Sequence, residues 1–324
     1  MSSRYPHIFL VILLVSILSG CHTSPTSPAK EAQHQVKEPP VQLVGTGKVG
    51  TIIPATSALA IQQKNGQIIY QQNANQQLPI ASLTKLVTYV TIRRLIKTKK
   101  LSWQHTVKIN AALSNFSQNR NYSNVFLKSG DSYTVRQLVN AALIQSADGA
   151  TIALIQATGL TSIAFVGQMK KSLSIIGIHD AKIYNGIGLN NEDMGIFGDA
   201  NLPNDAENTM SAKDLGRLVL YLLKTYPDML ETTAQKSAPF ADVSGHTQLL
   251  STFNKMLPNM PYAMPKITID GLKTGTTEAA GACFISTGTI GSKRYITIVL
   301  HANNGGDNRF IATQRLYQFI QKQA

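Results

Sequence analysis

Cysteine and acidic residues are scarce in this chain. Only 2 of its 324 residues are cysteine, and Asp and Glu together number 17, against 30 Lys and Arg. The 7 His residues are scattered and show neither an HExxH pattern nor any other paired spacing that would suggest metal ligands. The sequence therefore predicts neither a metal ion nor another cofactor.

The chain also lacks a dense run of Lys and Arg interleaved with aromatic residues. Its one short basic stretch, Arg93–Lys100, is typical of the solvated end of a helix. Nucleic acid is thus the weaker explanation for the formal net charge of +13. A basic surplus of this size favours an anionic environment, such as acidic lipid or an acidic polymer.

No apolar run near the N-terminus is long enough for a comfortable membrane span. Arg4 precedes an apolar run from Ile8 to Leu18 that only Ser16 interrupts, a pattern typical of a cleaved signal peptide. The run closes with Leu-Ser-Gly-Cys, which resembles a bacterial lipobox whose Cys21 becomes the lipidated first residue. We expect residues 1–20 to be a lipoprotein signal peptide; an ordinary signal peptide with an incidental Cys is the alternative.

The next segment, residues 21–50, is rich in Ser, Thr, Pro, Gln and Lys. Because such a composition buries little surface, we expect a flexible tether there and a folded domain over residues 51–324. If Cys21 carries lipid, Cys283 has no partner in the chain. It lies in an apolar run, so we expect a buried and inert thiol.

The folded part begins with a hairpin signal and ends with strands. Two β-prone runs flank Asn65-Gly66, the pair favoured in tight hairpin turns. Amphipathic patterns predict helices at residues 82–97, on both sides of residue 146, and at 162–177, 211–226 and 307–321. Strands are expected at residues 268–276, 281–290 and 294–302. Strands at both ends with helices between them predict a single α/β unit with one shared sheet.

Ser82 and Lys85 stand one helical turn apart at the start of the first predicted helix. A Ser hydroxyl needs a neighbouring base to become a nucleophile, and positions i and i+3 share one helix face. Ser-x-x-Lys also arises by chance, since the chain contains it a second time at Ser27 and Lys30. Lys85 would act as a base only if burial or another cation lowered its pKa, so a second cation and a polar relay should exist.

The chain offers both elements. Ser146 lies where two predicted helices meet, and a Lys-Thr-Gly sequence begins at Lys273 in a predicted strand. Each feature alone is weak, because a Ser between helices is usually a cap and Lys-Thr-Gly is usually an edge strand entering a turn. Their order and their placement on helix, junction and strand make the joint interpretation much stronger.

These three elements resemble those of the serine-type D-alanyl-D-alanine carboxypeptidases, the low-molecular-mass penicillin-binding proteins of peptidase family S11. The resemblance runs from about residue 57 to the C-terminus. It includes the segments FLKSGDSYTVRQL, NGIGL, TMSAKDLGRL, NKML and DGLKTGTTEAAGACFIS. It implies an α/β fold of the β-lactamase and penicillin-binding transpeptidase type, in which helices flank an antiparallel sheet beside a helical subdomain.

The resemblance also implies a role for each matching residue. Ser82 would attack the substrate carbonyl, Lys85 would be its general base and Ser146 would relay a proton to the leaving D-Ala. The backbone N–H groups of Ser82 and Thr276 would form the oxyanion hole. The implied substrate-binding residues are Asp148, Lys273, Thr274, Gly275, Thr276 and Arg309. For Arg309 the alternative is a surface residue at the start of a helix.

One residue departs from the family pattern. The second element is Ser-x-Asn in the family, but Asp148 stands here in place of the Asn. An Asn amide can donate a hydrogen bond to substrate, whereas an ionised Asp only accepts. A nearby carboxylate also raises the pKa of a lysine, so Asp148 would oppose the function of Lys85.

We therefore expect a carboxypeptidase in the cell envelope that is lipid-anchored to the membrane. It would remove the terminal D-Ala of peptidoglycan stem pentapeptides through an acyl-enzyme, and β-lactams would inhibit it covalently. One alternative is a β-lactamase of the same fold, although Glu192 and Glu207 lie outside the Glu-x-x-Leu-Asn pattern that such enzymes carry. The other is a catalytically weak, wall-binding lipoprotein in which Asp148 blunts the chemistry.

Overall fold

The computed structural model describes residues 40–47 and 52–323. The predicted signal peptide at 1–20, the lipidation site Cys21 and most of the predicted tether lie outside these residues. Residues 40–47 fall within the predicted tether, yet they contact the domain. Val41 N donates to Ile176 O at 3.3 Å, and Val44 pairs with Gln67 beside the first hairpin.

A five-stranded antiparallel sheet unites the two ends of the domain, as the sequence predicts. Its order is β2 (Gln67–Gln72), β1 (Ala55–Gln62), β11 (Lys293–Ala302), β10 (Gly281–Ile290) and β9 (Thr268–Thr277). The register pairs Ser57 with Leu300 and Phe284 with Val299. The N-terminal hairpin thus joins strands more than 200 residues away, and β9 forms the far edge.

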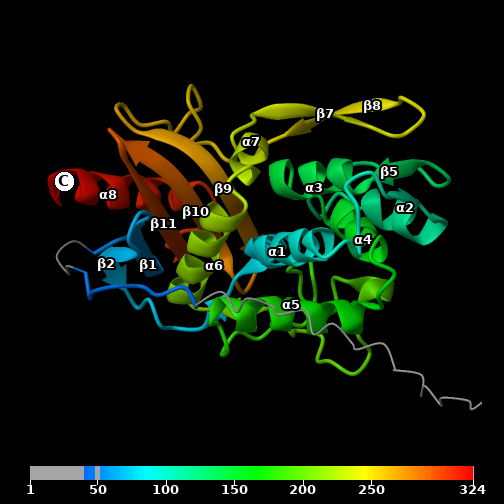
Figure 1. The fold of residues 1–324 in the computed structure, drawn as a ribbon, viewed down its shortest axis with the longest axis horizontal. Helices are drawn as coiled ribbons and strands as arrows, with labels where there is room; N and C mark the ends of the chain where they lie inside the picture. Colours follow the sequence, from blue (N-terminus) through cyan, green and yellow to red (C-terminus); the bar gives the residue numbers. More distant parts are fainter. Residues whose placement is uncertain (1–39, 48–51, 324) are drawn as a thin grey trace, which may run out of the picture. The chain divides into compact units, whose positions relative to one another are not determined.

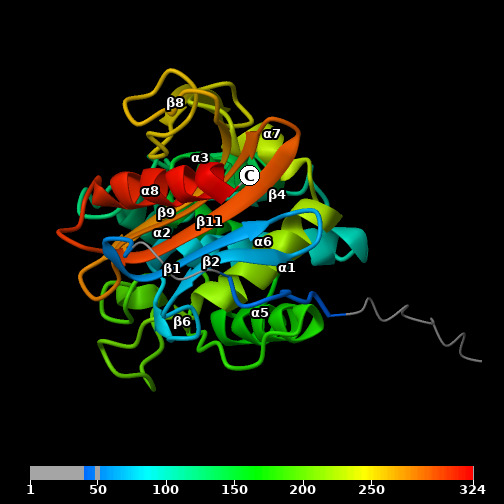
Figure 2. The same ribbon diagram turned by 90° about the vertical axis from the view of Figure 1, so that its left-hand side faces the viewer.

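Helices cover both faces of this sheet (Figures 1 and 2). Helix α8 (Asn308–Gln323) packs on one face against β10 and β11, and α6 (Ala212–Thr225) packs on the other. Each face has its own apolar core. The core under α8 is rich in aromatic side chains, including Phe284, Phe310 and Tyr317. Because helices cover both faces, β10 is buried along most of its length instead of alternating between buried and exposed residues.

A helical part lies beside the sheet on the side of α1, at the right of Figure 1. Its helices are α1 (Thr84–Lys97), α2 (Ala111–Ser117), α3 (Val135–Ile144), α4 (Asp148–Gln156) and α5 (Ser162–Ile176). Two further short helical segments are α7 (Met229–Thr233) and the 3-10 turn η2 (Gly195–Phe197). The predicted helical subdomain is therefore present.

Side-chain caps set several helix starts. Thr134 and Gln137 form a reciprocal capping box at the start of α3, and Ser211 and Asp214 form another at α6. Thr161 caps α5, which ends at Gly177 in a left-handed conformation. These caps explain why the helix boundaries match the predicted ones closely.

Three small sheets complete the fold. They are β3 (Leu78–Pro79) with β6 (Thr209–Met210), β4 (Thr106–Lys108) with β5 (Ser132–Thr134), and β7 (Ser237–Ala241) with β8 (Thr247–Ser251). The sequence analysis predicted none of them. The strand pair β3–β6 lies directly before the Ser82 turn and fixes the entry of the chain into that turn: Ile80 N donates to Asn208 O at 3.1 Å.

Candidate active site

Ser82 lies in a single 3-10 turn, η1 (Ala81–Leu83), that leads directly into α1. Ala81 before it has a φ of +46°, a left-handed conformation that is unusual for a residue with a side chain. Residues held in such conformations cluster at functional sites. Ser82 is partly exposed, whereas Lys85 one turn later is buried, so the hydroxyl faces solvent while the amine lies behind it.

Three acceptors surround the Lys85 amine. Its Nζ donates to Ser82 Oγ at 2.8 Å, to Asp148 Oδ1 at 2.6 Å and to the Ile187 carbonyl at 2.8 Å. An ammonium group has three N–H donors and no acceptor, so all three are used. The predicted contact between Ser82 and Lys85 is therefore present, and the orientation of the amine is fixed by Asp148 and Ile187.

Burial and Asp148 act in opposite directions on Lys85. Removal from water lowers the pKa of Lys85, and this effect outweighs the attraction of the Asp148 carboxylate, which raises it. The pKa of Asp148 is in turn raised by burial, although Lys85 and Lys273 both lower it. Both groups of this pair are thus shifted toward their neutral forms.

Ser146 and Lys273 form a second hydrogen-bonded pair. Ser146 sits between α3 and α4 with a φ of +59°, and its Oγ accepts a hydrogen bond of 2.7 Å from Lys273 Nζ. Lys273 also donates to its neighbour's carbonyl, Thr274 O, at 2.9 Å. The pKa of Lys273 is lowered by burial and further by the positive charges of Lys85 and Arg309. Lys273 is thus a second basic group near Lys85, but the lowered pKa of Lys85 comes from burial, and a role of Lys273 in lowering it stays a prediction.

Strand β9, which carries the Lys-Thr-Gly sequence, is in close contact with η1, the turn that holds Ser82 and is called the nucleophile turn below. A Cβ atom on Gly275 would lie 2.9 Å from Ile80 O and 3.2 Å from Leu83 N. Because real Cβ atoms do not approach backbone oxygen this closely, only Gly allows β9 to run beside η1. This approach brings Thr274 and Thr276 to the same cavity as Ser82.

Arg309 is buried under this strand, so it is not the exposed helix-start residue that the sequence left open. Its Nη1 donates to the carbonyls of Gly275 at 2.8 Å and Cys283 at 3.1 Å, and its Nη2 donates to Thr276 Oγ1 at 2.7 Å. The guanidinium also lines the cavity. Arg309 therefore orients the Thr276 hydroxyl and adds positive charge beside it.

The segment Asn185–Leu189 supports the nucleophile turn from the other side. Asn185 Oδ1 accepts from the backbone N–H groups of Ile187 at 3.0 Å and Gly188 at 2.7 Å, which holds the Ile187 carbonyl toward Lys85. Gly188 has a φ of +91°, and a Cβ there would overlap the Ala81 carbonyl oxygen. Asn208 links this loop to α1, since its Nδ2 donates to Thr84 Oγ1 at 3.0 Å.

The sequence alone indicates no role for Asn185, Ile187 or Asn208. NGIGL was noted only as part of the family resemblance, and a backbone carbonyl such as that of Ile187 has no side-chain signature. The Asn-Gly-x-Gly pattern was the available signal, because an Asn followed by two glycines predicts a tight loop with an Asn side chain bonded to its backbone.

A cavity of about 250 Å³ opens above these groups. It is lined by Ser82, Ser123, Ser146, Phe253, Lys255, Thr274, Gly275, Thr276, Gly306, Asp307, Arg309 and Phe310. Of the predicted site residues, Lys85, Asp148 and Lys273 lie behind this lining. Asp148 was predicted to bind substrate, but its contacts are with Lys85, and a role in substrate binding stays a prediction.

Two other expectations concern cysteine and membrane spans. Cys283 is buried, and burial raises the pKa of its thiol to about 11, as expected for an inert thiol. Within residues 40–47 and 52–323, the helices are all too short or too polar to span a bilayer. Cys21 lies outside these residues.

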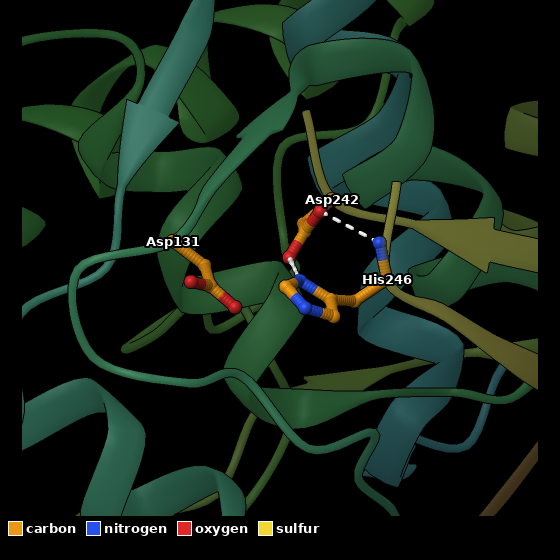
Figure 3. A group of neighbouring side chains, drawn as sticks. All are labelled: Asp131, Asp242 and His246. Carbon is orange, nitrogen blue, oxygen red and sulfur yellow. Dashed lines mark hydrogen bonds and ion pairs between the residues drawn. The ribbon is translucent and has the colours of Figure 1, made fainter. Parts of the chain in front are cut away.

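One group of side chains in the described part of the chain could hold a metal ion. Asp131, Asp242 and His246 approach one another at the tip of the β7–β8 hairpin (Figure 3). Asp242 accepts from His246 Nδ1 at 2.9 Å and from the N–H groups of Ser244 and His246. Burial alone would raise the pKa of Asp242, but the hydrogen bonds from His246 lower it to about 2. None of the three lines the Ser82 cavity, and their contacts close the hairpin turn.

Comparison with known proteins identifies the family. The family model described as D-alanyl-D-alanine carboxypeptidase, peptidase S11, matches residues 46–304, and this chain belongs to that family. The D-alanyl-D-alanine carboxypeptidase DacF of Bacillus subtilis is 24% identical over 81% of this chain and 61% of its own length. The chain spans about three-fifths of the first curated relatives it matches, with shares of 61% and 57%.

Solved structures agree with the fold. A peptidoglycan synthesis regulatory factor, PBP3, from Streptococcus pneumoniae is 35% identical with a TM-score of 0.77, covering 84% of this chain and 74% of that one. Penicillin-binding protein D2 from Listeria monocytogenes in an ampicillin-bound form is 28% identical with a TM-score of 0.64, covering 84% and 99%. The predicted antiparallel sheet flanked by helices is thus confirmed as a penicillin-binding protein fold.

Proposed function

We propose that this protein is a serine-type D-alanyl-D-alanine carboxypeptidase that removes the terminal D-Ala of peptidoglycan stem pentapeptides. The observation that carries the proposal is the 2.8 Å contact between Lys85 Nζ and Ser82 Oγ, at a buried amine whose pKa is lowered. Family membership and the names of the relatives support it. β-Lactams would acylate the same serine, in line with the ampicillin-bound neighbour.

In the first step, neutral Lys85 takes the proton of Ser82 Oγ as Oγ attacks the carbonyl carbon of the penultimate D-Ala. General base catalysis of this kind is worth about 10²–10⁴ in rate. The developing oxyanion would be held by the backbone N–H groups of Ser82 and Thr276, where loss of one donor costs on the order of 10²–10³. The product of this step is an acyl-enzyme on Ser82.

The leaving D-Ala needs a proton on its nitrogen. Ser146 Oγ lines the cavity and accepts a hydrogen bond from Lys273 Nζ, so a protonated Lys273 can replace the proton that Ser146 passes to the leaving nitrogen. Lys273 regains this proton when Lys85 gives up the one that it took from Ser82. Thr274, Thr276 and Arg309 would hold the terminal carboxylate, since two hydroxyls and a guanidinium meet at that wall. Water then hydrolyses the ester and restores Ser82.

Asp148 fits this scheme as the partner that places Lys85. Burial raises the pKa of Asp148 and lowers that of Lys85, and the two atoms lie 2.6 Å apart. Burial therefore favours the neutral Lys85 amine even beside Asp148. This weakens the alternative in which Asp148 blunts the chemistry.

A β-lactamase function finds less support. Of the two Glu residues noted in the sequence, Glu207 contacts strand β9, since its Oε2 accepts from Thr277 Oγ1 at 2.8 Å. Burial raises the pKa of Glu207, which favours the protonated form that cannot act as a base. Among the described residues that line the cavity there is no Glu.

We also infer that the protein is exported and lipid-anchored through Cys21 to the membrane of the cell envelope. The charged and then apolar leader ending in Leu-Ser-Gly-Cys supports this inference. The lipid would keep a cationic domain close to acidic lipids and anionic wall polymers.

Turnover separates the three candidate functions. The purified protein is given a D-Ala-D-Ala peptide and, separately, a chromogenic cephalosporin. We expect release of D-Ala with slow cephalosporin turnover. Fast cephalosporin hydrolysis without D-Ala release would instead support a β-lactamase, and covalent penicillin labelling without turnover of either substrate would support a weak, wall-binding protein.

A further inference from the structure

One wall of the Ser82 cavity consists of side chains that the proposed reaction does not use. Phe253, Lys255 and Asp307 line the cavity together with Arg309 and Phe310. Phe253 and Lys255 follow strand β8, whereas Asp307 lies at the start of α8. These segments are far apart in the sequence, so the wall exists only in the folded protein.

An ion pair joins the two segments. Lys255 Nζ lies 2.7 Å from Asp307 Oδ2, and Tyr262 OH donates to the same oxygen at 3.3 Å. Tyr262 N donates to Lys255 O at 2.9 Å, and its ring packs on Phe310 with centroids 5.3 Å apart. The pair is thus held in place from both segments. With 44% and 41% of their side chains exposed, such a pair contributes little to stability.

This wall lies on the side that receives the leaving residue. Arg309 Nε donates to Gly306 O at 2.8 Å, so the turn that carries Asp307 packs directly against the guanidinium assigned to the terminal carboxylate. A leaving residue whose carboxylate meets Arg309 would direct its side chain toward this wall. Phe253 lines the cavity and is 46% exposed, so its ring is accessible to a ligand there.

We propose that Phe253 and the Lys255–Asp307 ion pair restrict the side chain of the leaving D-amino acid to a small, uncharged group. This inference rests on the proposed function and names its specificity. A cavity of about 250 Å³ must hold the atoms on both sides of the scissile bond, so little space remains for a long side chain on the leaving residue. Because Asp307 pairs with Lys255, the lysine offers no unpaired positive charge to a second carboxylate there.

The test compares three peptides with the same acyl portion, which end in D-Ala-D-Ala, D-Ala-D-Leu and D-Ala-D-Glu. The variants are Phe253→Ala, Lys255→Ala and Asp307→Asn, and the matched control is Lys293→Ala, an exposed lysine in the β10–β11 turn at the other end of the sheet. The amino acid released is quantified, and kcat/KM is obtained for each peptide. Penicillin labelling of each variant verifies that the Ser82 site is intact.

We expect kcat/KM of the parent and of Lys293→Ala to be about 10-fold or more higher for release of D-Ala than for release of D-Leu. This ratio is the lower end of the discrimination that a pocket achieves by side-chain size. In Phe253→Ala and Lys255→Ala this ratio should fall at least fivefold, because kcat/KM for D-Leu rises. Asp307→Asn keeps the shape of the wall and should change the ratio less, but it should speed release of D-Glu from a third peptide.

An unchanged ratio in variants that still release D-Ala overturns the inference and leaves the proposed function intact. Equal losses on all peptides also overturn it, because the residues would then be structural. A parent protein that labels with penicillin but releases no D-amino acid overturns the proposed function itself, and the inference with it.

Discussion

Lys85 Nζ and Asp148 Oδ1 lie 2.6 Å apart, and both side chains are almost fully buried. Removing one partner of such a pair usually leaves an uncompensated charge and destabilises the fold strongly. Here burial already shifts both groups toward neutrality, so the pair can give up its charges without losing its hydrogen bond. Burial and Asp148 together therefore set the pH at which Lys85 becomes a base.

Asp148→Asn should shift catalysis to lower pH. The carboxylate raises the pKa of Lys85, so removing it lowers that pKa, and neutral Lys85 is then populated at lower pH. We expect faster acylation by penicillin on the acidic side of the profile. Stopped-flow rates between about pH 5 and 10, a window that spans perturbed Asp and Lys values, measure this.

Asp228→Asn is the matched control for that experiment, because it removes a surface ion pair with Arg93 and does not contact Lys85. Its acylation profile should coincide with that of the parent. A slower Asp148→Asn protein with an unmoved profile would show that the carboxylate is itself required, against our electrostatic explanation.

Arg309→Ala should weaken transition-state binding of the substrate by about 1.5–3 kcal/mol, the range for a hydrogen bond to a charged group. The loss should nearly disappear when the peptide's terminal carboxylate is amidated. Because Arg309 also bonds to the Gly275 and Cys283 carbonyls, thermal unfolding of the variant must be measured alongside kcat/KM. Equal losses on both peptides would mean that Arg309 only supports the strand.

Much of this site follows from the sequence because the groups that do chemistry are side chains at characteristic spacings. Ser82 and Lys85 share a helix face, and Lys273 was recognisable in its strand. The Lys85–Ile187 contact was not predictable in this way, since a carbonyl is available at every residue. The direction of the Lys85 pKa also required the structure, because burial and Asp148 oppose each other.

The fold likewise combines features that local sequence patterns predict with contacts that only the structure shows. The Asn65-Gly66 hairpin and the long strands were predicted from local patterns, and the sheet confirms them. The β7–β8 hairpin was missed because β7 carries Pro239 and β8, Thr-Gln-Leu-Leu-Ser, shows no regular alternation of polar and apolar residues. The wall formed by Lys255 and Asp307 depends on a contact between residues that are 52 positions apart, which no local pattern reveals.

Gly188→Ala should raise the activation free energy of penicillin acylation by more than it lowers the free energy of unfolding. A Cβ there meets the Ala81 carbonyl oxygen and Thr84 Oγ1, so the nucleophile turn must move. Overpacking of this kind typically costs about 1–3 kcal/mol of stability. Penicillin acylation rates and denaturant unfolding of the same protein measure the two effects.

Gly167→Ala provides the comparison for Gly188→Ala. Gly167 lies in α5 with no atom near the position of a Cβ, so Ala should stabilise the helix by up to about 1 kcal/mol and leave acylation unchanged. An acylation rate in Gly188→Ala equal to that of the parent would show that the loop does not position Ser82.

Cys21→Ser tests the anchor. The lipidated Cys would be the first residue of the mature protein, so its replacement should block processing or release the protein from the membrane fraction. Cys283→Ala, which alters only the buried thiol, should remain membrane-bound. A processed and membrane-bound Cys21→Ser protein would rule out lipidation at this residue.

The account depends most on Ser82 as a nucleophile activated by Lys85, and intact-protein mass spectrometry after penicillin treatment tests this directly. We predict one added penicilloyl group on the parent protein, none on Ser82→Ala, and strongly slowed addition on Lys85→Ala that folds as judged by circular dichroism. Addition that persists in Ser82→Ala, or a parent protein that gains no mass, would contradict the account.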